Sequence, residues 1–190
     1  MLAAGASRRL GTPKQLLQLP DGSALVRRSA QRVCASRARR SAVIVGANAA
    51  QVVASLAGLE LDVVSSEDYR EGIAASIRAA AAWATEHQAA ALLLCVCDQP
   101  LLDTPHLDAL LEAFSVGGCL VASHYAEKRA VPAVFPARHF AELQTLRGDR
   151  GAASILNAAS RIALVEWPQG ELDVDRPGDW ERAERAELGR

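Results

Sequence analysis

The segment before residue 15 combines small residues with basic side chains in a way that suits phosphate binding. It reads Leu2-Ala3-Ala4-Gly5-Ala6-Ser7-Arg8-Arg9-Leu10-Gly11-Thr12-Pro13-Lys14. Small residues let backbone N–H groups close around phosphate oxygens, and Arg9 and Lys14 can neutralise charge on the same group. The spacing matches neither the Walker loop nor the glycine pattern of dinucleotide-binding folds. We therefore predict a distinct triphosphate-binding loop, and the alternative is a flexible basic tail.

A carboxylate follows the most strongly apolar run of the chain. Asp98 lies in the segment Cys97-Asp98-Gln99-Pro100, directly after Ala91 to Val96. Ligands of open α/β sheets gather at the carboxyl ends of the strands, so a carboxylate at this place would point into the expected cleft. We predict that Asp98 is a metal ligand. The alternative is a turn or N-cap for the helix that starts near Thr104.

Two further carboxylates, Asp173 and Asp175, precede the proline that opens the last predicted helix. Alternation in an extended segment places both on the same side, and hard carboxylate oxygens are the ligands that magnesium prefers. We predict that Asp98 and Asp175 hold one Mg²⁺ ion, with Asp173 as the other choice of second ligand. An aspartate before a proline is also a common way to start a helix.

Two glycine-containing segments each precede a predicted helix with little side-chain bulk. The first contains Gly72 and Ser76, and the second contains Gly148, Asp149 and Gly151. Exposed N–H groups at a helix start, together with the Ser76 hydroxyl, can contact a ribose, a base or a phosphate. Taken alone, each segment is better explained by a turn and a helix cap.

Short apolar runs alternate with longer alanine-rich segments and so predict an α/β fold. The predicted strands are Ala42 to Gly46, Leu59 to Ser65, Ala90 to Cys97, Cys119 to Ser123, Val131 to Phe135 and Ile162 to Trp167. The predicted helices are Ser23 to Ser36, Ala50 to Leu56, Ile73 to His87, Thr104 to Phe114, Arg138 to Leu146 and Gly151 to Ser160. Strands that are apolar at consecutive positions suit a mostly parallel sheet covered on both faces. We predict one three-layer domain over residues 1–190, whose first strand is short or lacks its beginning.

Composition limits the classes of partner. The net charge of −1 gives no overall attraction to nucleic acid or to an anionic membrane, although residues 1–40 hold nine lysines and arginines against one acid. An arginine-rich stretch without interleaved aromatic residues is more typical of a solvated helix face than of a nucleic-acid surface. No segment approaches the roughly 20 apolar residues of a membrane span. We expect neither nucleic acid nor a membrane among the partners.

The cysteines point to a reducing compartment. They stand at positions 34, 95, 97 and 119, and their spacing suits neither a disulfide framework nor a zinc knuckle. A cytoplasmic location is therefore the simplest expectation.

Several motifs in order resemble a known family. The segments LAAGASRRLGTPK, EGIAASI, CDQP, VPAVFP, GDRGA and DVDRPGDW resemble the molybdenum cofactor cytidylyltransferase branch of the MobA-like nucleotidyltransferases over nearly the full length. The resemblance implies a Rossmann-like fold in which Arg9 and Lys14 contact the triphosphate and Asp98 with Asp175 positions magnesium. Within that family the Leu-Ala-Ala-Gly form goes with cytosine nucleotides, so Ala4 favours CTP.

The resemblance also implies roles for individual residues. Those implied in catalysis are Arg9, Lys14 and Asp98. Those implied in nucleotide binding are Leu2, Ala3, Ala4, Gly5, Ser7, Arg9, Lys14, Gly72, Ser76 and Asp98. Those implied in binding the acceptor are Pro132, Gly148, Asp149 and Gly151. Two departures lie on the acceptor side: Lys128 to Val131 stand where family members carry glycine and often histidine, and Ala153 stands where an arginine often follows.

The implied reaction is transfer of CMP from CTP to the terminal phosphate of molybdopterin, with release of pyrophosphate and with Mg²⁺ as cofactor. A molybdenum hydroxylase is the implied recipient of the product. Two alternatives stay open: a nucleotidyltransferase for another phosphorylated acceptor, and a non-catalytic carrier that hands the cofactor to a molybdenum hydroxylase.

Overall fold

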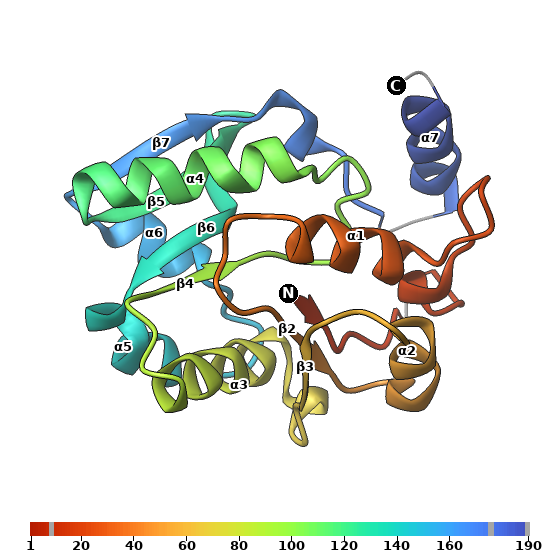
Figure 1. Ribbon diagram of the computed structural model, residues 1–190, viewed down its shortest axis with the longest axis horizontal. Helices are drawn as coiled ribbons and strands as arrows, with labels where there is room; N and C mark the ends of the chain where they lie inside the picture. Colours follow the sequence, from red (N-terminus) through yellow and green to blue (C-terminus); the bar gives the residue numbers. More distant parts are fainter. Residues whose placement is uncertain (8–9, 175–176, 189–190) are drawn as a thin grey trace.

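The computed structural model describes residues 1–7, 10–174 and 177–188, and these fold as alternating strands and helices (Figure 1). The strands are β1 (Leu2–Ala3), β2 (Ala42–Val45), β3 (Asp62–Ser65), β4 (Ala91–Leu94), β5 (Leu120–Tyr125), β6 (Lys128–Pro136) and β7 (Ile162–Glu166). The α-helices are α1 (Leu25–Cys34), α2 (Ala49–Ser55), α3 (Ile73–Glu86), α4 (Thr104–Gly117), α5 (Phe140–Gln144), α6 (Ala153–Ala158) and α7 (Pro177–Leu188). Short 3-10 turns are η1 (Lys14–Leu16), η2 (Tyr69–Glu71), η3 (Ala137–His139) and η4 (Pro168–Glu171).

The strands form two sheets that β1 joins. Strands β1, β2 and β3 are parallel neighbours, and β4, β6, β5 and β7 follow one another in the second sheet. Leu2 of β1 also bridges in parallel to Val96, just beyond β4. Only β6 among these strands runs antiparallel to its neighbours, β4 and β5, whereas β5 and β7 are parallel. The prediction of a mostly parallel sheet is therefore confirmed, with β6 as the exception.

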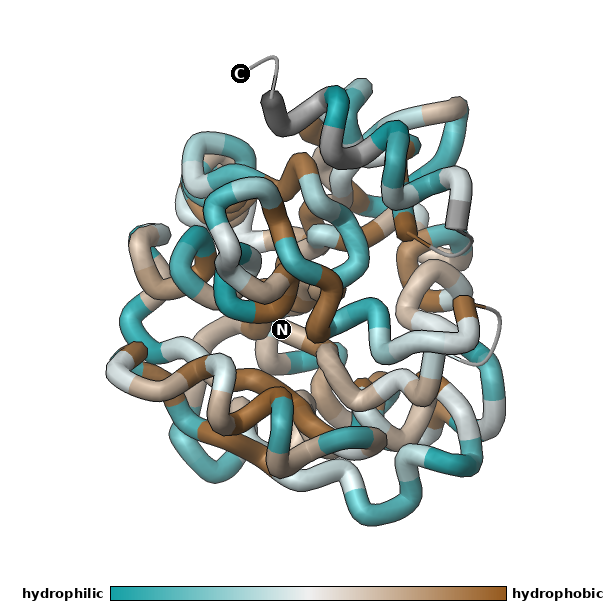
Figure 2. Tube along the Cα trace, turned by 90° about the vertical axis from the view of Figure 1, so that its right-hand side faces the viewer, coloured by the Kyte–Doolittle hydropathy of each residue, from teal (hydrophilic) through white to brown (hydrophobic). Residues whose placement is uncertain are grey.

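Central strands send alternate side chains to cores on the two faces of the sheet, whereas β3 is mostly exposed. In β2, Ile44 packs with α3, α5 and α6, whereas Val43 and Val45 pack with α1, α2 and α4. In Figure 1, α4 lies above β4, and α3 and α5 lie below β4. Hydrophilic segments run mostly along the outside of the molecule (Figure 2). The consecutive apolar residues of the strands are thus explained by burial on both faces, and the predicted three layers are confirmed.

Some boundaries differ from the prediction. Strand β3 begins at Asp62 rather than Leu59, because Leu59 and Leu61 pack against a core from a loop that follows Gly58. Strand β6 begins at Lys128, before the apolar run, because a tight turn joins it to β5. Polar residues can extend a strand where its hydrogen bonds to the neighbouring strand continue. Hydrophobicity alone therefore does not locate the first residues of β3 and β6.

Two arginines of α1 donate hydrogen bonds to backbone carbonyls of other segments. Arg27 donates to the carbonyl oxygens of Ser55 and Ala57 at 2.8 and 3.0 Å, where α2 ends. Arg32 donates to the carbonyl of Pro100 at 2.6 Å. Carbonyls at a helix end have no intrahelical partner, so a guanidinium there satisfies them. These contacts give part of the arginine-rich stretch a structural role. Within the described residues, no helix combines the length and apolar character needed to cross a bilayer.

A buried histidine joins α4 to the sheet. The His106 Nε2 atom lies 2.7 Å from Ser123 Oγ, and Ser123 donates to the carbonyl of Pro132 at 2.6 Å. The imidazole stacks on Trp167 with ring centroids 4.7 Å apart. Burial lowers the pKa of His106 to about 4. The buried environment therefore stabilises the neutral imidazole of His106 relative to the protonated one.

We predict that His106 makes the protein less stable in mild acid. Its native pKa of about 4 lies below its value in the unfolded chain, so between these values the unfolded state binds a proton that the native state does not. From pH 7 to pH 5 this residue should lower the free energy of unfolding by about 2 kcal/mol. Urea denaturation at both pH values measures this change. In His106→Gln, the part of the decrease in free energy of unfolding that comes from His106 should be absent.

The matched control for this measurement is His139→Gln, because His139 lies on η3 and is partly exposed. That variant should keep the acid sensitivity of the wild type. Equal acid sensitivity in wild type and His106→Gln would contradict the prediction.

Candidate active site

A cavity of about 420 Å³ opens where β1, β3 and β4 end. Its walls come from the loop after β1, from η2 and the start of α3, and from the segment after β4. The lining residues are Leu2, Ala3, Ala4, Gly5, Ala6, Ser7, Leu10, Lys14, Gln15, Tyr69, Arg70, Glu71, Gly72, Ile73, Ser76, Val96, Cys97, Asp98 and Asp149. These three strands run in the same direction. Their carboxyl ends, and the loops that follow them, therefore meet at one edge of the sheet.

The loop after β1 is shaped by a fully buried glutamine. Gln15 Nε2 donates to the carbonyl oxygens of Ala3 at 3.1 Å and Gly5 at 2.6 Å. Its Oε1 atom accepts from Ser7 Oγ at 3.3 Å, and Ser7 Oγ in turn accepts from the backbone N–H of Lys14 at 2.9 Å. Because carbonyls 3 and 5 point toward Gln15, the chain between them curves around that side chain. The loop is therefore held by its own polar network.

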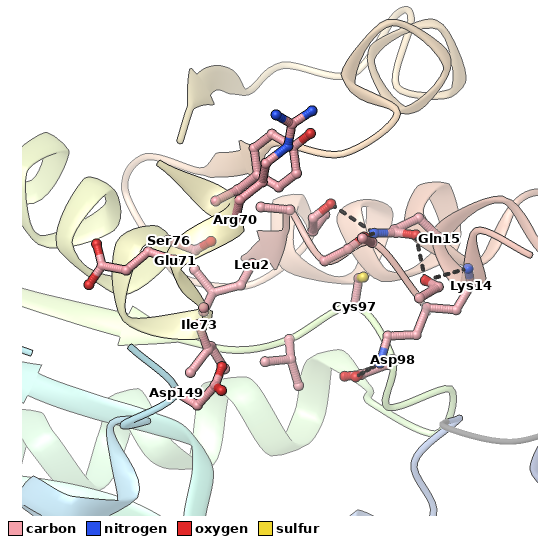
Figure 3. A pocket seen from close by; sticks show the side chains of 18 of the residues that line it. Leu2, Lys14, Gln15, Arg70, Glu71, Ile73, Ser76, Cys97, Asp98 and Asp149 are labelled. Atoms are coloured by element: carbon pink, nitrogen blue, oxygen red, sulfur yellow. Dashed lines mark hydrogen bonds and ion pairs between the residues drawn. The ribbon is translucent and has the colours of Figure 1, made fainter. Parts of the chain in front are cut away.

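Lys14 and Asp98 meet at one side of this cavity. The Lys14 ammonium donates to Asp98 Oδ2, and the two side chains are 16% and 19% exposed. Figure 3 shows this pair on one side and Asp149 on the opposite side. The second carboxylate oxygen, Asp98 Oδ1, is buried and has no hydrogen-bond partner among the described residues. A buried carboxylate oxygen without a donor is costly, which makes it available to a cation.

The segment that carries the predicted second metal ligand runs beside Asp98. The backbone N–H of Val174 donates to the Asp98 carbonyl at 2.9 Å. Burial raises the pKa of the Tyr125 hydroxyl, and the negative charges of Asp173 and Asp98 add to this shift. Both carboxylates therefore act on the same phenol. Asp175, like Arg9 of the predicted phosphate loop, lies outside the described residues.

The start of α3 is closely packed against the loop that contains Asp149. Gly72 has a φ of 133°, and a Cβ atom there would lie 2.5 Å from both Asp149 Oδ1 and the Gly148 carbonyl oxygen. Only glycine fits this backbone and this approach. Ser76, one turn into the helix, is buried and lines the cavity. The structure thus brings the predicted Gly72 and Ser76 to the same cavity as Lys14 and Asp98.

The residues predicted to bind the acceptor divide into two groups. Asp149 lines the cavity, and Gly148 adjoins it through the contact with Gly72. Pro132 is buried in β6, where its carbonyl accepts from Ser123, and neither Pro132 nor Gly151 lines the cavity. The structure therefore brings Asp149 together with the predicted nucleotide-binding residues and leaves Pro132 and Gly151 apart from them.

Sequence reasoning did not find Gln15, Tyr69, Arg70 or Glu71, which all line the cavity. Gln15 follows Lys14 and precedes Leu16-Leu17, so the sequence does not mark it as buried, and only the structure shows that it is fully buried. The Arg70 guanidinium lies 5.6 Å from the centre of the Tyr69 ring. No motif in the sequence marks that pair, because its position depends on the turn after β3.

Cys97 lines the cavity but is unsuited to nucleophilic attack. Burial and the neighbouring charge of Asp98 raise the pKa of its thiol to about 12. The thiolate is the nucleophilic form, and at neutral pH almost none is present. The charged side chains that line the cavity are Lys14, Arg70, Glu71, Asp98 and Asp149.

Comparisons with known proteins identify the family of this chain. The sequence model of the MobA-like NTP transferase domain matches residues 1–163. A search among curated proteins finds no match. Among solved structures, the Rv0371c homolog from Mycobacterium sp. strain JC1 is 27% identical, with a TM-score of 0.84 over 100% of this chain and 95% of that chain.

Two other solved structures extend this likeness. Rv0371c of Mycobacterium tuberculosis H37Rv, in complex with manganese, is 25% identical, with a TM-score of 0.78 over 97% of this chain and 96% of that chain. The molybdopterin-guanine dinucleotide biosynthesis protein A of Archaeoglobus fulgidus is 17% identical, with a TM-score of 0.72 over 100% of this chain and 97% of that chain. At 17% identity the likeness concerns the fold alone. The family match, in contrast, spans most of the chain, including the loop after β1, the start of α3, Asp98 and Asp149. The chain therefore belongs to the MobA-like NTP transferase family and is a nucleotidyltransferase of that type.

Proposed function

We propose that this protein transfers CMP from CTP to the terminal phosphate of a molybdopterin-type acceptor and releases pyrophosphate. The observation that carries the proposal is the contact between Lys14 and Asp98 beside the loop after β1. A cation for phosphate oxygens and a carboxylate for a metal ion stand together on one wall of a cavity. Such a pair suits the transfer of a nucleotidyl group better than the binding of an uncharged ligand.

A divalent cation fits this site. Asp98 offers a buried oxygen, Oδ1, that has no hydrogen-bond partner among the described residues, and carboxylate oxygens are the ligands of Mg²⁺. We propose Asp98 and Asp175 as its ligands, with Asp173 as the other choice for the second. The manganese complex of Rv0371c supports a divalent metal in a related protein. When bound, the ion would neutralise charge on the triphosphate.

The chain's own residues would then align the reacting groups. An oxygen of the acceptor's terminal phosphate attacks the α-phosphorus of CTP, and the bond from that phosphorus to the pyrophosphate oxygen breaks. The acceptor needs no protein base, because a phosphate monoester with a second pKa of about 6 is largely dianionic at pH 7. Lys14, Arg9 and the N–H groups of the loop after β1 would stabilise the leaving pyrophosphate.

The two substrates would occupy different parts of the cavity. Ala4, Ser7 and Ser76 lie where a nucleoside triphosphate would meet the loop after β1 and the start of α3. Ala4 favours CTP over GTP by the family resemblance. Asp149 lies on the opposite wall from Lys14 and would face the acceptor (Figure 3).

We predict that pyrophosphate release requires CTP, Mg²⁺ and molybdopterin together. Purified protein should turn over with CTP at least tenfold faster than with GTP, as a coupled pyrophosphate assay can measure. Faster turnover with GTP would contradict the role of Ala4. Turnover with a different phosphorylated acceptor in place of molybdopterin would support the alternative acceptor. Binding of the cofactor without turnover on any triphosphate would support the carrier.

We predict that Lys14→Gln and Asp98→Asn each lower kcat about 100-fold or more, because each removes a charge that the transition state needs. Both substitutions keep the approximate shape of the side chain. The control is Arg161→Gln, which removes an exposed cation directly before β7. Near wild-type kcat for both site variants would show that the pair has no catalytic role.

We predict that Gln15→Leu raises the KM for CTP and lowers stability. Leucine has a similar volume but leaves the carbonyl oxygens of Ala3 and Gly5 without their donor, at about 1–3 kcal/mol for an unsatisfied buried group. Gln18→Leu, at an exposed position four residues from Lys14, is the control. Thermal unfolding and steady-state kinetics measure the two effects. An unchanged KM would show that the loop keeps its shape without Gln15.

A further inference from the structure

One carboxylate joins the start of α3 to the loop that carries Asp149. Glu71 Oε1 accepts from the backbone N–H of Gly148 at 2.9 Å and from Arg78 Nη1 at 2.9 Å, and Oε2 pairs with Arg78 Nη2. These three residues, Glu71, Arg78 and Gly148, are called the Glu71 latch below. The latch spans 77 positions of sequence between Glu71 and Gly148.

Further hydrogen bonds attach the same loop to the same helix. Arg78 Nη1 also donates to the Leu146 carbonyl at 2.9 Å, and the backbone N–H of Ala74 donates to the Gly148 carbonyl at 3.1 Å. The loop is thus held at Leu146 and at Gly148, directly before Asp149. Because Gly72 has no Cβ, the loop can approach within contact distance of the backbone there.

The hydrogen bonds of the latch also keep the Glu71 carboxylate ionised. The hydrogen bonds from Arg78 and from the Gly148 N–H lower the pKa of Glu71 to about 2, so Glu71 is ionised at neutral pH. Arg78 lies directly against that charge. Asp149, the next residue after Gly148, contributes its carboxylate to the cavity wall opposite Lys14 (Figure 3). Asp149 is itself exposed, and the hydrogen bonds to Leu146 and Gly148 hold the backbone directly before it. Fixing that backbone restricts the positions that the carboxylate can take, which favours binding of a partner.

We propose that Glu71 is a positioning residue that holds Asp149 in place to accept hydrogen bonds from N–H or O–H groups of the acceptor substrate. This inference rests on the proposed function. It assigns the acceptor a chemical requirement beyond its terminal phosphate: a second part that carries donors and reaches across the cavity. The latch acts through the loop at 146–149 and Asp149, because the Glu71 carboxylate is engaged by Arg78 and by the Gly148 N–H.

Steady-state kinetics with CTP and molybdopterin tests the inference. Glu71→Ala should raise the KM for the acceptor about tenfold while the KM for CTP changes less than twofold, because loss of a charge-assisted hydrogen bond frees the loop. Glu71→Gln keeps a carbonyl oxygen for the Gly148 N–H and should lie between wild type and Glu71→Ala. Asp149→Asn should match Glu71→Ala, and the double variant should be no worse than either single one.

A charge swap separates positioning from stability. Glu71→Arg with Arg78→Glu can restore an ion pair and the thermal midpoint, but an arginine at position 71 cannot accept from the Gly148 N–H. The acceptor KM of the swap should therefore stay high. Glu112→Gln removes one of the two carboxylates that pair with the surface residue Arg37. It is the matched control and should leave both values unchanged.

Hydrogen exchange provides a readout that does not depend on turnover. Amides of residues 146–149 should exchange about tenfold faster in Glu71→Ala than in wild type. Unchanged exchange together with an unchanged acceptor KM would overturn the latch, even if the wild type transfers CMP. If the wild type gives no turnover, the acceptor role falls with the proposed function, while faster exchange would still establish the latch itself.

Discussion

The short strand β1 is the constraint on which the site depends. Its Leu2 N–H donates to the Cys95 carbonyl at 2.8 Å, and its carbonyl accepts from the Cys97 N–H at 3.1 Å. On the other side, Leu2 and Ala3 pair with Ile44 and Val45 of β2. Two residues thus join the two sheets, and the loop that follows them is carried directly beside Asp98. The contact of Lys14 with Asp98 is a consequence of this arrangement.

Much of the fold could be predicted because burial leaves a clear mark on sequence. Runs such as Ala91 to Leu94 are apolar at consecutive positions, and such a strand must be covered on both faces. The direction of β6 could not be predicted in this way. An apolar run has the same composition in either direction, so only the tight turn after Tyr125 determines that β6 pairs antiparallel with β5.

The residues of the candidate site that could be predicted are those whose type itself indicates a chemical role. Lys14, Asp98, Gly72 and Ser76 were selected from their types and neighbours, and all four line one cavity. Gln15 and Glu71 are not predicted from the sequence, because each depends partly on backbone groups far along the folded chain or around the loop. The carbonyl of Gly5 and the N–H of Gly148 are present in every sequence, so only the folded chain shows which side chain reaches them.

The position of Cys97 has a consequence for how the protein would respond to its surroundings. Peroxides and alkylating reagents attack the thiolate, and a pKa of about 12 keeps Cys97 protonated at physiological pH. Cys95, in the same strand region, is also buried, and burial raises its pKa as well. Oxidative stress should therefore leave this wall of the cavity chemically unchanged, a form of redox tolerance that comes from packing alone.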